Sequence, residues 1–234
     1  MPPVAVVIAA LNEEESLPGV LAEIPGTACG LPVETIVVDD GSTDRTSEVA
    51  RAAGVHVHRF EVNEGHGVAL RAGYRIAREE LGADYIVTLD ADGQWNPAEM
   101  EGVLQPLVDG EADFVIGSRV LGATETDDSF RQAGVHVYAR LVRLLTGVRV
   151  TDTSSGFRAL RAEVTARVRQ TQVQYQTSEL LIGAIFAGYR IAERPIVMRK
   201  RFAGESKKGH NILYGARYAR VILRTWWRER TATA

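Results

Sequence analysis

The chain has 234 residues, a formal net charge of −3 and an ordinary globular composition, with 45% hydrophobic and 24% charged residues. This length suits one domain with a substantial core, and the composition excludes a low-complexity protein. Cys29 is the only cysteine, so an intrachain disulfide is excluded, which fits a reducing compartment.

Short apolar runs alternate with longer amphipathic segments in the first half of the chain. The runs predict strands at Val4–Ala10, Glu34–Asp39, Val55–Phe60, Asp84–Asp90 and Ala112–Gly117. The segments between them predict helices at Glu14–Ile24, Thr43–Ala53, Gly67–Leu81 and Pro97–Val108. This alternation favours an α/β fold with a mostly parallel sheet that helices cover on both faces.

The regular alternation ends after Arg119. We expect a polar acidic loop at Gly122–Ser129, a helix at Phe130–Leu145 and a loop with a short strand at Thr151–Leu160. A second helix at Thr177–Gly188, a strand at Arg190–Met198 and a terminal helix at Ile212–Arg228 should follow. The sequence shows no internal repeat and no linker. We therefore expect one domain over residues 1–209 and a basic amphipathic helix over residues 210–234.

The sequence gives no sign of a signal peptide or a membrane span. Met1-Pro2-Pro3 leads into a strand-like run without a basic segment, which is not typical of a signal peptide. No apolar stretch approaches the roughly 18–20 residues that a spanning helix needs. We expect a cytoplasmic protein, or a peripheral one on the cytoplasmic face of a membrane.

The stretch from Arg199 to Arg230 is strongly basic. It holds ten Lys or Arg and two Glu, a net of +8, which leaves −11 for the rest of the chain because the total is −3. A basic tail on an acidic body suggests an anionic partner for the tail. Its arginines alternate at helical spacing with an apolar stripe, Ile212, Leu213, Tyr214, Tyr218, Val221, Ile222 and Trp226. This pattern is typical of a helix at a membrane surface, with packing on the core or a homodimer as the alternatives.

One carboxylate ends the strand at Asp90, and a second follows it. Asp90 and Asp92 lie one residue apart, and the side-chain amide of Gln94 comes next. Open α/β sheets bind ligands at the carboxyl ends of their strands. Mg²⁺ or Mn²⁺ bound by one or two carboxylates completes its shell with water and phosphate oxygens. The motif therefore indicates a divalent cation against a nucleotide diphosphate.

Polar residues also follow the first two strands. Asn12 and Glu13 come after the first, and Asp39 and Asp40 stand at the end of the second, so all four are expected at the same edge. Carboxylates there can accept hydrogen bonds from a base N–H and a ribose hydroxyl. Capping of the next helix is the alternative role. Asn63-Glu64-Gly65-His66-Gly67 precedes a helix, and its glycines allow either a close backbone approach to a ligand or a simple turn.

These motifs occur in a characteristic order, together with Gly117-Ser118-Arg119, Ser155-Gly156-Phe157-Arg158 and Gly204-Glu205-Ser206-Lys207. The set resembles the GT-A, family-2 inverting glycosyltransferases, and within them the dolichol-phosphate (polyprenyl-phosphate) mannosyltransferase branch. The resemblance spans about Val4 to Lys208. It implies a GT-A fold and transfer of a hexose from a nucleotide-diphosphate sugar to a lipid phosphate at the membrane surface.

The resemblance also implies residue roles. Asp90, Asp92 and Gln94 would bind Mg²⁺ or Mn²⁺. The nucleotide site would include Ala10, Asn12, Glu13, Asp39, Asp40, Gly67, Asp90, Ala91 and Arg131. Asp92 would be catalytic as a metal ligand. Arg119 and Arg201 would also be catalytic, because they match arginines that contact phosphates, as Arg131 does. Guanidinium groups bind phosphate oxygens in a bidentate way.

Several alternatives stay open. A lipid phosphate is already an anion and needs no strong base, whereas a hydroxyl acceptor needs one, for which Glu179 is the candidate. A nucleotide-sugar binding protein without turnover is the third possibility. The chain departs from the branch where Gln132-Ala133-Gly134-Val135 follows Arg131, and where Ala9-Ala10-Leu11 replaces the more frequent Pro-x-Tyr. GDP-mannose, UDP-glucose and a UDP-N-acetylhexosamine all remain candidate donors, and no nucleic-acid partner is expected.

Overall fold

The computed structural model describes residues 1–125, 129–202 and 212–232, with the side chains of 129–131 and 212–214 left out. Within that part of the chain, eight strands form one sheet in the order β2-β3-β1-β5-β7-β6-β8, with β4 beside β3. The strands are β1 Val4–Ala10, β2 Thr27–Ala28, β3 Leu31–Asp39, β4 His56–Arg59, β5 Tyr85–Asp90, β6 Phe114–Thr124, β7 Arg158–Arg161 and β8 Ile191–Met198. Strands β4, β3, β1 and β5 are parallel, as are β6 and β8, while β7 is antiparallel to both of its neighbours. The predicted α/β fold with a mostly parallel sheet is confirmed.

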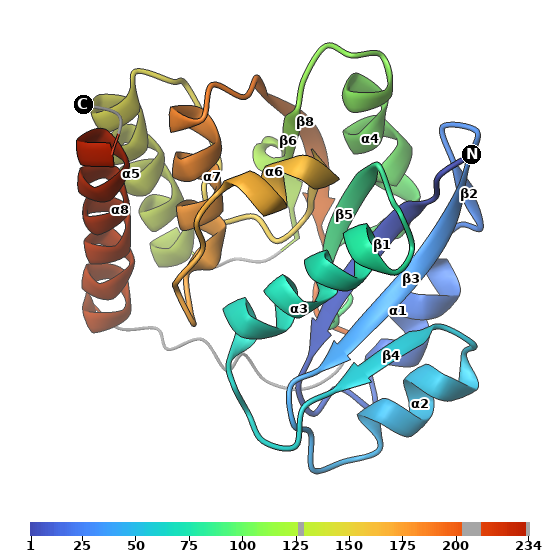
Figure 1. The fold of residues 1–234 in the computed structure, drawn as a ribbon. Coiled ribbons are helices and arrows are strands. Elements are labelled where there is room, and N and C mark those ends of the chain that lie inside the picture. The colour runs from blue at the N-terminus through green and yellow to red at the C-terminus, as the bar shows by residue number, and fades with distance from the viewer. Residues whose placement is uncertain (126–128, 203–211, 233–234) are drawn as a thin grey trace.

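Helices pack on both faces of this sheet. They are α1 Leu17–Glu23, α2 Thr46–Ala52, α3 His66–Glu79, α4 Met100–Val108, α5 Ser129–Thr146, α6 Ala162–Arg167, α7 Gln176–Phe186 and α8 Ile212–Ala232, with a 3₁₀ turn at Pro97–Glu99. Helices α5, α7 and α8 contact one another and form a group at the left of Figure 1, far from α1 and α2. No helix in the described ranges has the length and apolar character that crossing a membrane requires.

Strand β1 shows how the sequence builds two cores. All seven of its residues are buried and apolar, as expected for a central strand covered on both faces. Ala5 and Val7 belong to one core, with side chains of α3, α7 and α8, and Val6 and Ile8 belong to the other, with side chains of α1 and α4. The two-residue period of a strand produces this division.

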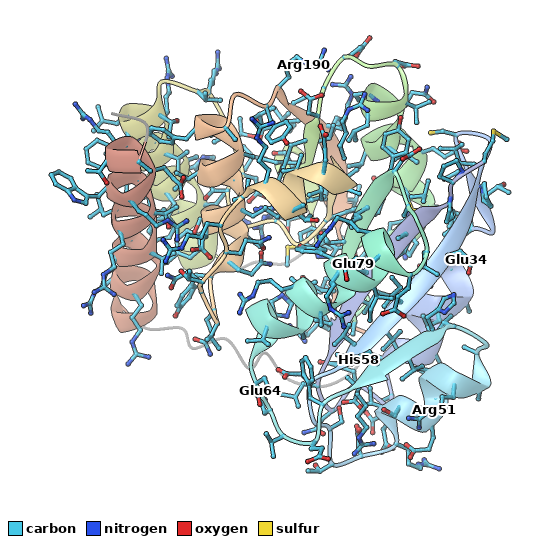
Figure 2. The ribbon with its side chains drawn as sticks, viewed as in Figure 1. Glu34, Arg51, His58, Glu64, Glu79 and Arg190 are labelled. Atoms are coloured by element: carbon cyan, nitrogen blue, oxygen red, sulfur yellow. The ribbon has the colours of Figure 1, made fainter. Side chains whose placement is uncertain are left out.

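Two residues labelled in Figure 2 show which way the strands run: Glu64 lies near the carboxyl end of β3, and Arg190 lies near the amino end of β8. The backbone N–H of Glu64 donates to Asp40, next to the end of β3, at 2.8 Å. Arg190 precedes β8, and its guanidinium pairs with Asp113, before β6, at 2.8 Å. The strands β1, β3 and β5 therefore point their carboxyl ends toward the Glu64 side.

Two expectations from the sequence were wrong in the second half. The predicted loop from Gly122 is in part strand, because β6 continues to Thr124 after a bulge and pairs again with β8. Gly122 allows this pairing, since a Cβ atom there would lie 2.1 Å from the carbonyl oxygen of Ile196. Helix α6 was not predicted, because its six residues are too short for a clear helical period.

The apolar stripe of the terminal helix faces protein. Tyr218 is 4% exposed, Val221 7% and Ile222 0%, and the Tyr218 hydroxyl donates to the carbonyl oxygen of Thr153 at 3.0 Å. Trp226 donates through its indole N–H to the carbonyl oxygen of Leu145 on α5 at 2.8 Å. The assignment of this stripe to a membrane was therefore wrong for these four residues, and the alternative of core packing holds. The side chains of Ile212, Leu213 and Tyr214 lie outside the described residues, as does the predicted boundary at 209.

Candidate active site

The parallel register brings the predicted polar residues to one edge of the sheet. Ala9 lies beside Asp90 in the pairing of β1 with β5, and Ala10 lies beside Asp39 in the pairing of β1 with β3. The loop that carries Asn12 starts at the end of β1 and leaves the sheet at this same edge. The structure thus assembles one edge from three strands, in the region where α/β sheets bind ligands.

The Asp90 carboxylate is held between two neighbours. The indole N–H of Trp95 donates to Asp90 Oδ2 at 2.8 Å. On another side the backbone of Gly156 lies so close that a Cβ atom there would be 2.6 Å from the same oxygen. The hydroxyl of Thr88 holds this loop by donating to the Gly156 carbonyl oxygen at 2.6 Å. Gly156 is therefore needed for close packing against Asp90, which gives a physical reason for the glycine in the Ser155–Arg158 motif.

Asp92 is paired with Arg201. Its side chain is 6% exposed, and Oδ2 lies 2.7 Å from Nη2 of Arg201, while Oδ1 accepts the backbone N–H of Gln94 at 3.0 Å. The two residues come from segments more than one hundred positions apart in the sequence. The structure thus places the predicted phosphate-binding Arg201 against the predicted metal ligand Asp92.

The segment from Arg199 to Phe202, which we call the strap, lies along the Asp-x-Asp loop. The backbone N–H of Arg199 donates to the carbonyl oxygen of Gln94 at 2.8 Å, and that of Phe202 donates to the carbonyl oxygen of Asp92 at 3.1 Å. The ring of Phe202 lies against Gly93, where a Cβ atom would meet it at 2.4 Å. The glycine at position 93 therefore admits this strap as well as forming a turn with φ of +75°.

The donor set at this loop suits a hard divalent cation. Asp90 and Asp92 supply carboxylate oxygens and Gln94, 5% exposed, supplies an amide oxygen. No group of three or more His, Cys, Asp or Glu side chains is arranged for a metal within the described residues. The residues fit a cation that takes its remaining ligands from water and phosphate, provided that Arg201 leaves Asp92 Oδ2.

Arg119 has a buried acidic partner that the sequence analysis missed. Its guanidinium pairs in a bidentate way with Asp152, with Nε to Oδ2 at 2.7 Å and Nη2 to Oδ1 at 3.0 Å, and Nη2 also donates to Ser154 at 2.6 Å. Although burial acts to raise it, the pKa of the Asp152 carboxyl lies below its usual value because Arg119 is adjacent. The Cζ atom of Arg119 lies 5.6 Å from the ring centroid of Trp95. Asp152 precedes the Ser155–Arg158 motif by three positions, and only this proximity could have drawn attention to it.

Hydrogen bonds join the first two polar loops. Asn12 adopts a left-handed backbone with φ of +52° and accepts the backbone N–H of Thr43 through Oδ1 at 2.8 Å. Asp39 is fully buried and accepts the backbone N–H of Ser42 at 2.8 Å and the hydroxyl of Ser47. These contacts give Asn12 and Asp39 a role in shaping the wall of the site. Contacts of Asn12, Glu13 and Asp39 with a base or ribose stay predictions.

Asp40 stabilises the turn formed by the Asn63–Gly67 motif. Asp40 accepts the backbone N–H groups of Glu64 at 2.8 Å and Gly65 at 3.0 Å, and burial raises the pKa of the Asp40 carboxyl. A Cβ atom at Gly67 would lie 2.3 Å from the carbonyl oxygen of Gln172. The close approach that this glycine permits is therefore to protein backbone, and its predicted place in the nucleotide site has no support in this geometry.

Glu179 is buried in a structural ion pair. It is 0% exposed, and its Oε1 lies 2.7 Å from Nη1 of Arg228 on α8. It also accepts the backbone N–H groups of Thr171 and Gln172, each at 2.9 Å. A carboxylate engaged in this way fixes α7 to α8 and to the preceding loop, so the geometry favours a structural role over the predicted role as a base.

One predicted phosphate contact and one motif of the resemblance lie outside the described residues. The side chain of Arg131, at the start of α5, lies outside the described residues, as does the whole Gly204–Lys207 motif. Arg158, from another motif, is 2% exposed and donates to the carbonyl oxygens of Thr153 and Ser155, so it holds its own loop together.

Comparison with known proteins gives the family. The model of "Glycosyl transferase family 2" matches residues 5–169. The chain belongs to glycosyl transferase family 2. The prediction of a family-2 glycosyltransferase is confirmed, and this glycosyltransferase has similar relatives among curated proteins. A dolichyl-phosphate hexose transferase of Haloferax volcanii is 37% identical over 203 residues, 87% of this chain and 85% of that protein. A polyprenol monophosphomannose synthase of Mycolicibacterium smegmatis is 34% identical over 220 residues, 88% of this chain and 82% of that protein.

Solved structures agree on the fold. Glucosyl-3-phosphoglycerate synthase from Mycobacterium tuberculosis, in complex with Mn²⁺, UDP and glucosyl-3-phosphoglycerate, superposes with a TM-score of 0.74 at 23% identity, over 96% of this chain and 80% of that one. At this identity the likeness shows the GT-A fold alone. The predicted fold class is therefore confirmed.

Proposed function

We propose that this glycosyltransferase moves a hexose from a nucleotide-diphosphate sugar to a polyprenyl phosphate, with inversion at the anomeric carbon. A Mg²⁺ or Mn²⁺ ion bound by Asp90, Asp92 and Gln94 would serve the donor diphosphate. The observation that carries the proposal is the placement of Arg201 against Asp92 at 2.7 Å, with Cζ of Arg119 over the ring of Trp95, whose indole N–H donates to Asp90. Two acidic and two basic groups at one strand edge suit a diphosphate with its cation.

The names of the relatives support a lipid phosphate as acceptor. The Haloferax volcanii protein is named for a dolichyl phosphate, and the Mycolicibacterium smegmatis protein for a polyprenol product. A relative of Methanococcus voltae, 32% identical over 213 residues, is named for UDP-N-acetylglucosamine and dolichyl phosphate. The shared element in these names is the polyprenyl phosphate, whereas the sugar differs. We therefore propose the acceptor class and leave the choice among GDP-mannose, UDP-glucose and a UDP-N-acetylhexosamine to experiment.

The residues divide the electrostatic work of the reaction. A cation held by Asp90, Asp92 and Gln94 would supply a Lewis acid for the charge on the leaving nucleoside diphosphate. Arg201, released from Asp92, would donate to phosphate oxygens and add positive charge at the same place. Arg119 keeps Asp152 as a partner, so it offers a fixed guanidinium whose orientation costs no reorganisation during the reaction.

The acceptor phosphate explains why no general base is needed. It is an anion near neutral pH and can attack the anomeric carbon directly, in one displacement through an oxocarbenium-like state, which inverts the configuration. The burial of Glu179 against Arg228 agrees with this chemistry. An α-linked donor would therefore give a β-linked sugar phosphate lipid, and the hydroxyl-acceptor alternative gains nothing from the structure.

The exposed face of α8 supports a location at an anionic membrane surface. Arg217, Arg220 and Arg224 are exposed along it, and Leu223 is 46% and Trp227 63% exposed. Basic residues beside a tryptophan suit an interface with anionic headgroups. Because Tyr218 and Ile222 on the same helix belong to the core, point substitutions test this better than removal of the helix.

A flotation assay tests the membrane contact. The paired change Arg220→Glu and Arg224→Glu is expected to abolish flotation with vesicles that contain anionic lipid. The control is charge reversal away from α8, by Arg51→Glu on α2, which is exposed and lies far from α8 (Figures 1 and 2), compared with each single change Arg220→Glu and Arg224→Glu. Equal flotation of the paired variant and the control would remove α8 from the proposal.

Donor and acceptor are tested in two steps. Thermal-shift screening of GDP-sugars and UDP-sugars with Mn²⁺ identifies the donor, and turnover with a short polyprenyl phosphate follows. We expect a shift with one nucleotide class and product with the lipid phosphate. A shift without turnover would support the alternative of a nucleotide-sugar binding protein, and turnover only with a hydroxyl acceptor would replace the proposed acceptor class.

A further inference from the structure

Trp95 links the two halves of the candidate active site. It follows Gln94 directly and is 4% exposed. Its indole N–H donates to Asp90 Oδ2 at 2.8 Å, while its ring lies under the guanidinium of Arg119, with 5.6 Å from Cζ to the ring centroid. One side chain thus contacts both a candidate metal ligand and a candidate phosphate ligand.

We propose that Trp95 is a positioning residue, which sets the orientation of the Asp90 carboxylate for the cation and of the Arg119 guanidinium for the donor diphosphate. The proposal rests on the proposed function. A carboxylate on a strand end can rotate about its Cβ–Cγ bond, and a hydrogen bond to one oxygen limits that rotation. Outer hydrogen bonds of this kind orient ligands in metal sites, and their loss costs about 10- to 100-fold in metal affinity or activity.

The surroundings of Asp90 make the indole N–H well suited to this task. Gly156 lies close behind the carboxylate, so that even a Cβ atom at that position would be 2.7 Å from Oδ1. The carboxylate is therefore confined on one side by backbone and on another by a directed donor. Trp95 itself is held by a backbone bridge to Met198, which precedes the strap.

Arg119 contacts Asp152, Ser154 and the ring of Trp95, and its Nη1 atom donates to Sδ of Met198 at 3.3 Å. Asp152 and Ser154 bind its Nε and Nη2 atoms in the plane of the guanidinium. The Cζ atom of the same group lies over the ring of Trp95. The ring and the N–H of Trp95 therefore have separate effects, on Arg119 and on Asp90 respectively.

The competing explanation is that Trp95 only fills the core that it shares with Met100 and Phe157. The variant Trp95→Phe distinguishes the positioning role from core filling, because it keeps an aromatic ring under Arg119 and removes the indole N–H. A matched control is Trp226→Phe, which removes an indole N–H that donates at the same 2.8 Å, to the carbonyl oxygen of Leu145. Both variants lose one hydrogen bond, but only one loses it at Asp90.

The test measures Mn²⁺ affinity of the purified full chain by calorimetry, without donor. We expect Trp95→Phe to weaken Mn²⁺ binding by about 10- to 100-fold and Trp226→Phe to leave it unchanged. In turnover assays, Trp95→Phe is expected to need more Mn²⁺ and to recover kcat to within a few-fold at saturating metal. A Mn²⁺ affinity of Trp95→Phe within twofold of the wild type overturns the role of Trp95 alone. Absence of Mn²⁺ binding by the wild type overturns the proposed function with it.

A second measurement avoids any dependence on the folding of the Trp95 variant. The chain has three tryptophans, so the combined change Trp226→Phe and Trp227→Phe leaves Trp95 as the sole tryptophan, which is excited selectively near the red edge of its absorption. Paramagnetic Mn²⁺ bound at Asp90 is expected to quench this emission in a saturable way, with the midpoint found by calorimetry. Emission that does not respond to Mn²⁺ while calorimetry shows binding contradicts the proposal.

Discussion

Substitution of Arg201 by Gln should strengthen metal binding and weaken catalysis at the same time. In the structure Arg201 Nη2 lies 2.7 Å from Asp92 Oδ2, and the side chains are 18% and 6% exposed. A hydrogen bond between charged groups contributes roughly 1.5–3 kcal/mol. A cation that binds Asp92 has to displace this contact. Its removal should therefore tighten Mn²⁺ binding by about 10- to 150-fold, because each 1.4 kcal/mol is about tenfold in affinity.

The effect on donor sugar has the opposite sign. If Arg201 moves to the diphosphate, Arg201→Gln loses a charge-assisted contact of similar size, so kcat/KM for the donor should fall by about 10-fold or more. Calorimetry with Mn²⁺ alone gives the first number, and initial rates against donor concentration give the second.

Arg199→Gln is the matched control. It removes a guanidinium from the same strap, but Arg199 pairs with Glu23 on α1 at 2.8 Å and not with Asp92. This control should leave the Mn²⁺ affinity near that of the wild type. If Arg201→Gln binds Mn²⁺ no more tightly than the wild type and Arg199→Gln do, the cation does not have to displace Arg201, and the reasoning is refuted.

Three further results are expected. Asp92→Ala should remove Mn²⁺- or Mg²⁺-dependent sugar transfer by about 100-fold or more while the circular dichroism spectrum stays native, and turnover like wild type would remove Asp92 from the metal site. Gly156→Ala should weaken Mn²⁺ binding about tenfold, because the added methyl group would lie 2.6 Å from Asp90 Oδ2, and an unchanged affinity would show that Asp90 need not move. Asp113→Asn should destabilise the fold through loss of the pair with Arg190, whose side-chain hydrogen bond lowers the pKa of Asp113 to about 2. A carboxyl group whose pKa is lower in the folded than in the unfolded state stabilises the fold at pH values above its unfolded pKa. The difference in urea midpoint between wild type and Asp113→Asn should therefore be full above about pH 4 and shrink as the pH falls toward 2.

The sequence predicted the sheet and the edge of the site because both depend on local patterns. Val4–Ala10 is apolar on both faces and Ile86–Leu89 is buried on both, as in a covered central strand, and the first strand was predicted to the residue. The polar residues that end these strands meet because parallel strands end at one edge. Periodicity and position were sufficient for this part.

The partners of the predicted residues could not be found in this way. Asp152 lies 33 positions after Arg119, and Trp95 had no motif of its own. A helical period shows that α8 has an apolar face but not whether protein or lipid covers it, and the burial of Tyr218 and Ile222 settles that for those residues. Glu179 shows the same limit, because its partner Arg228 is 49 positions away on another helix.

The most direct test of the proposed function is the product itself. The purified full chain, incubated with Mn²⁺, the donor found by thermal shift and a short polyprenyl phosphate, should give a sugar phosphate lipid. NMR of that product should show a β-linked hexose from an α-linked donor. A retained α configuration, or sugar transfer to hydroxyl acceptors with none to the lipid phosphate, would contradict direct attack by the acceptor phosphate at this site.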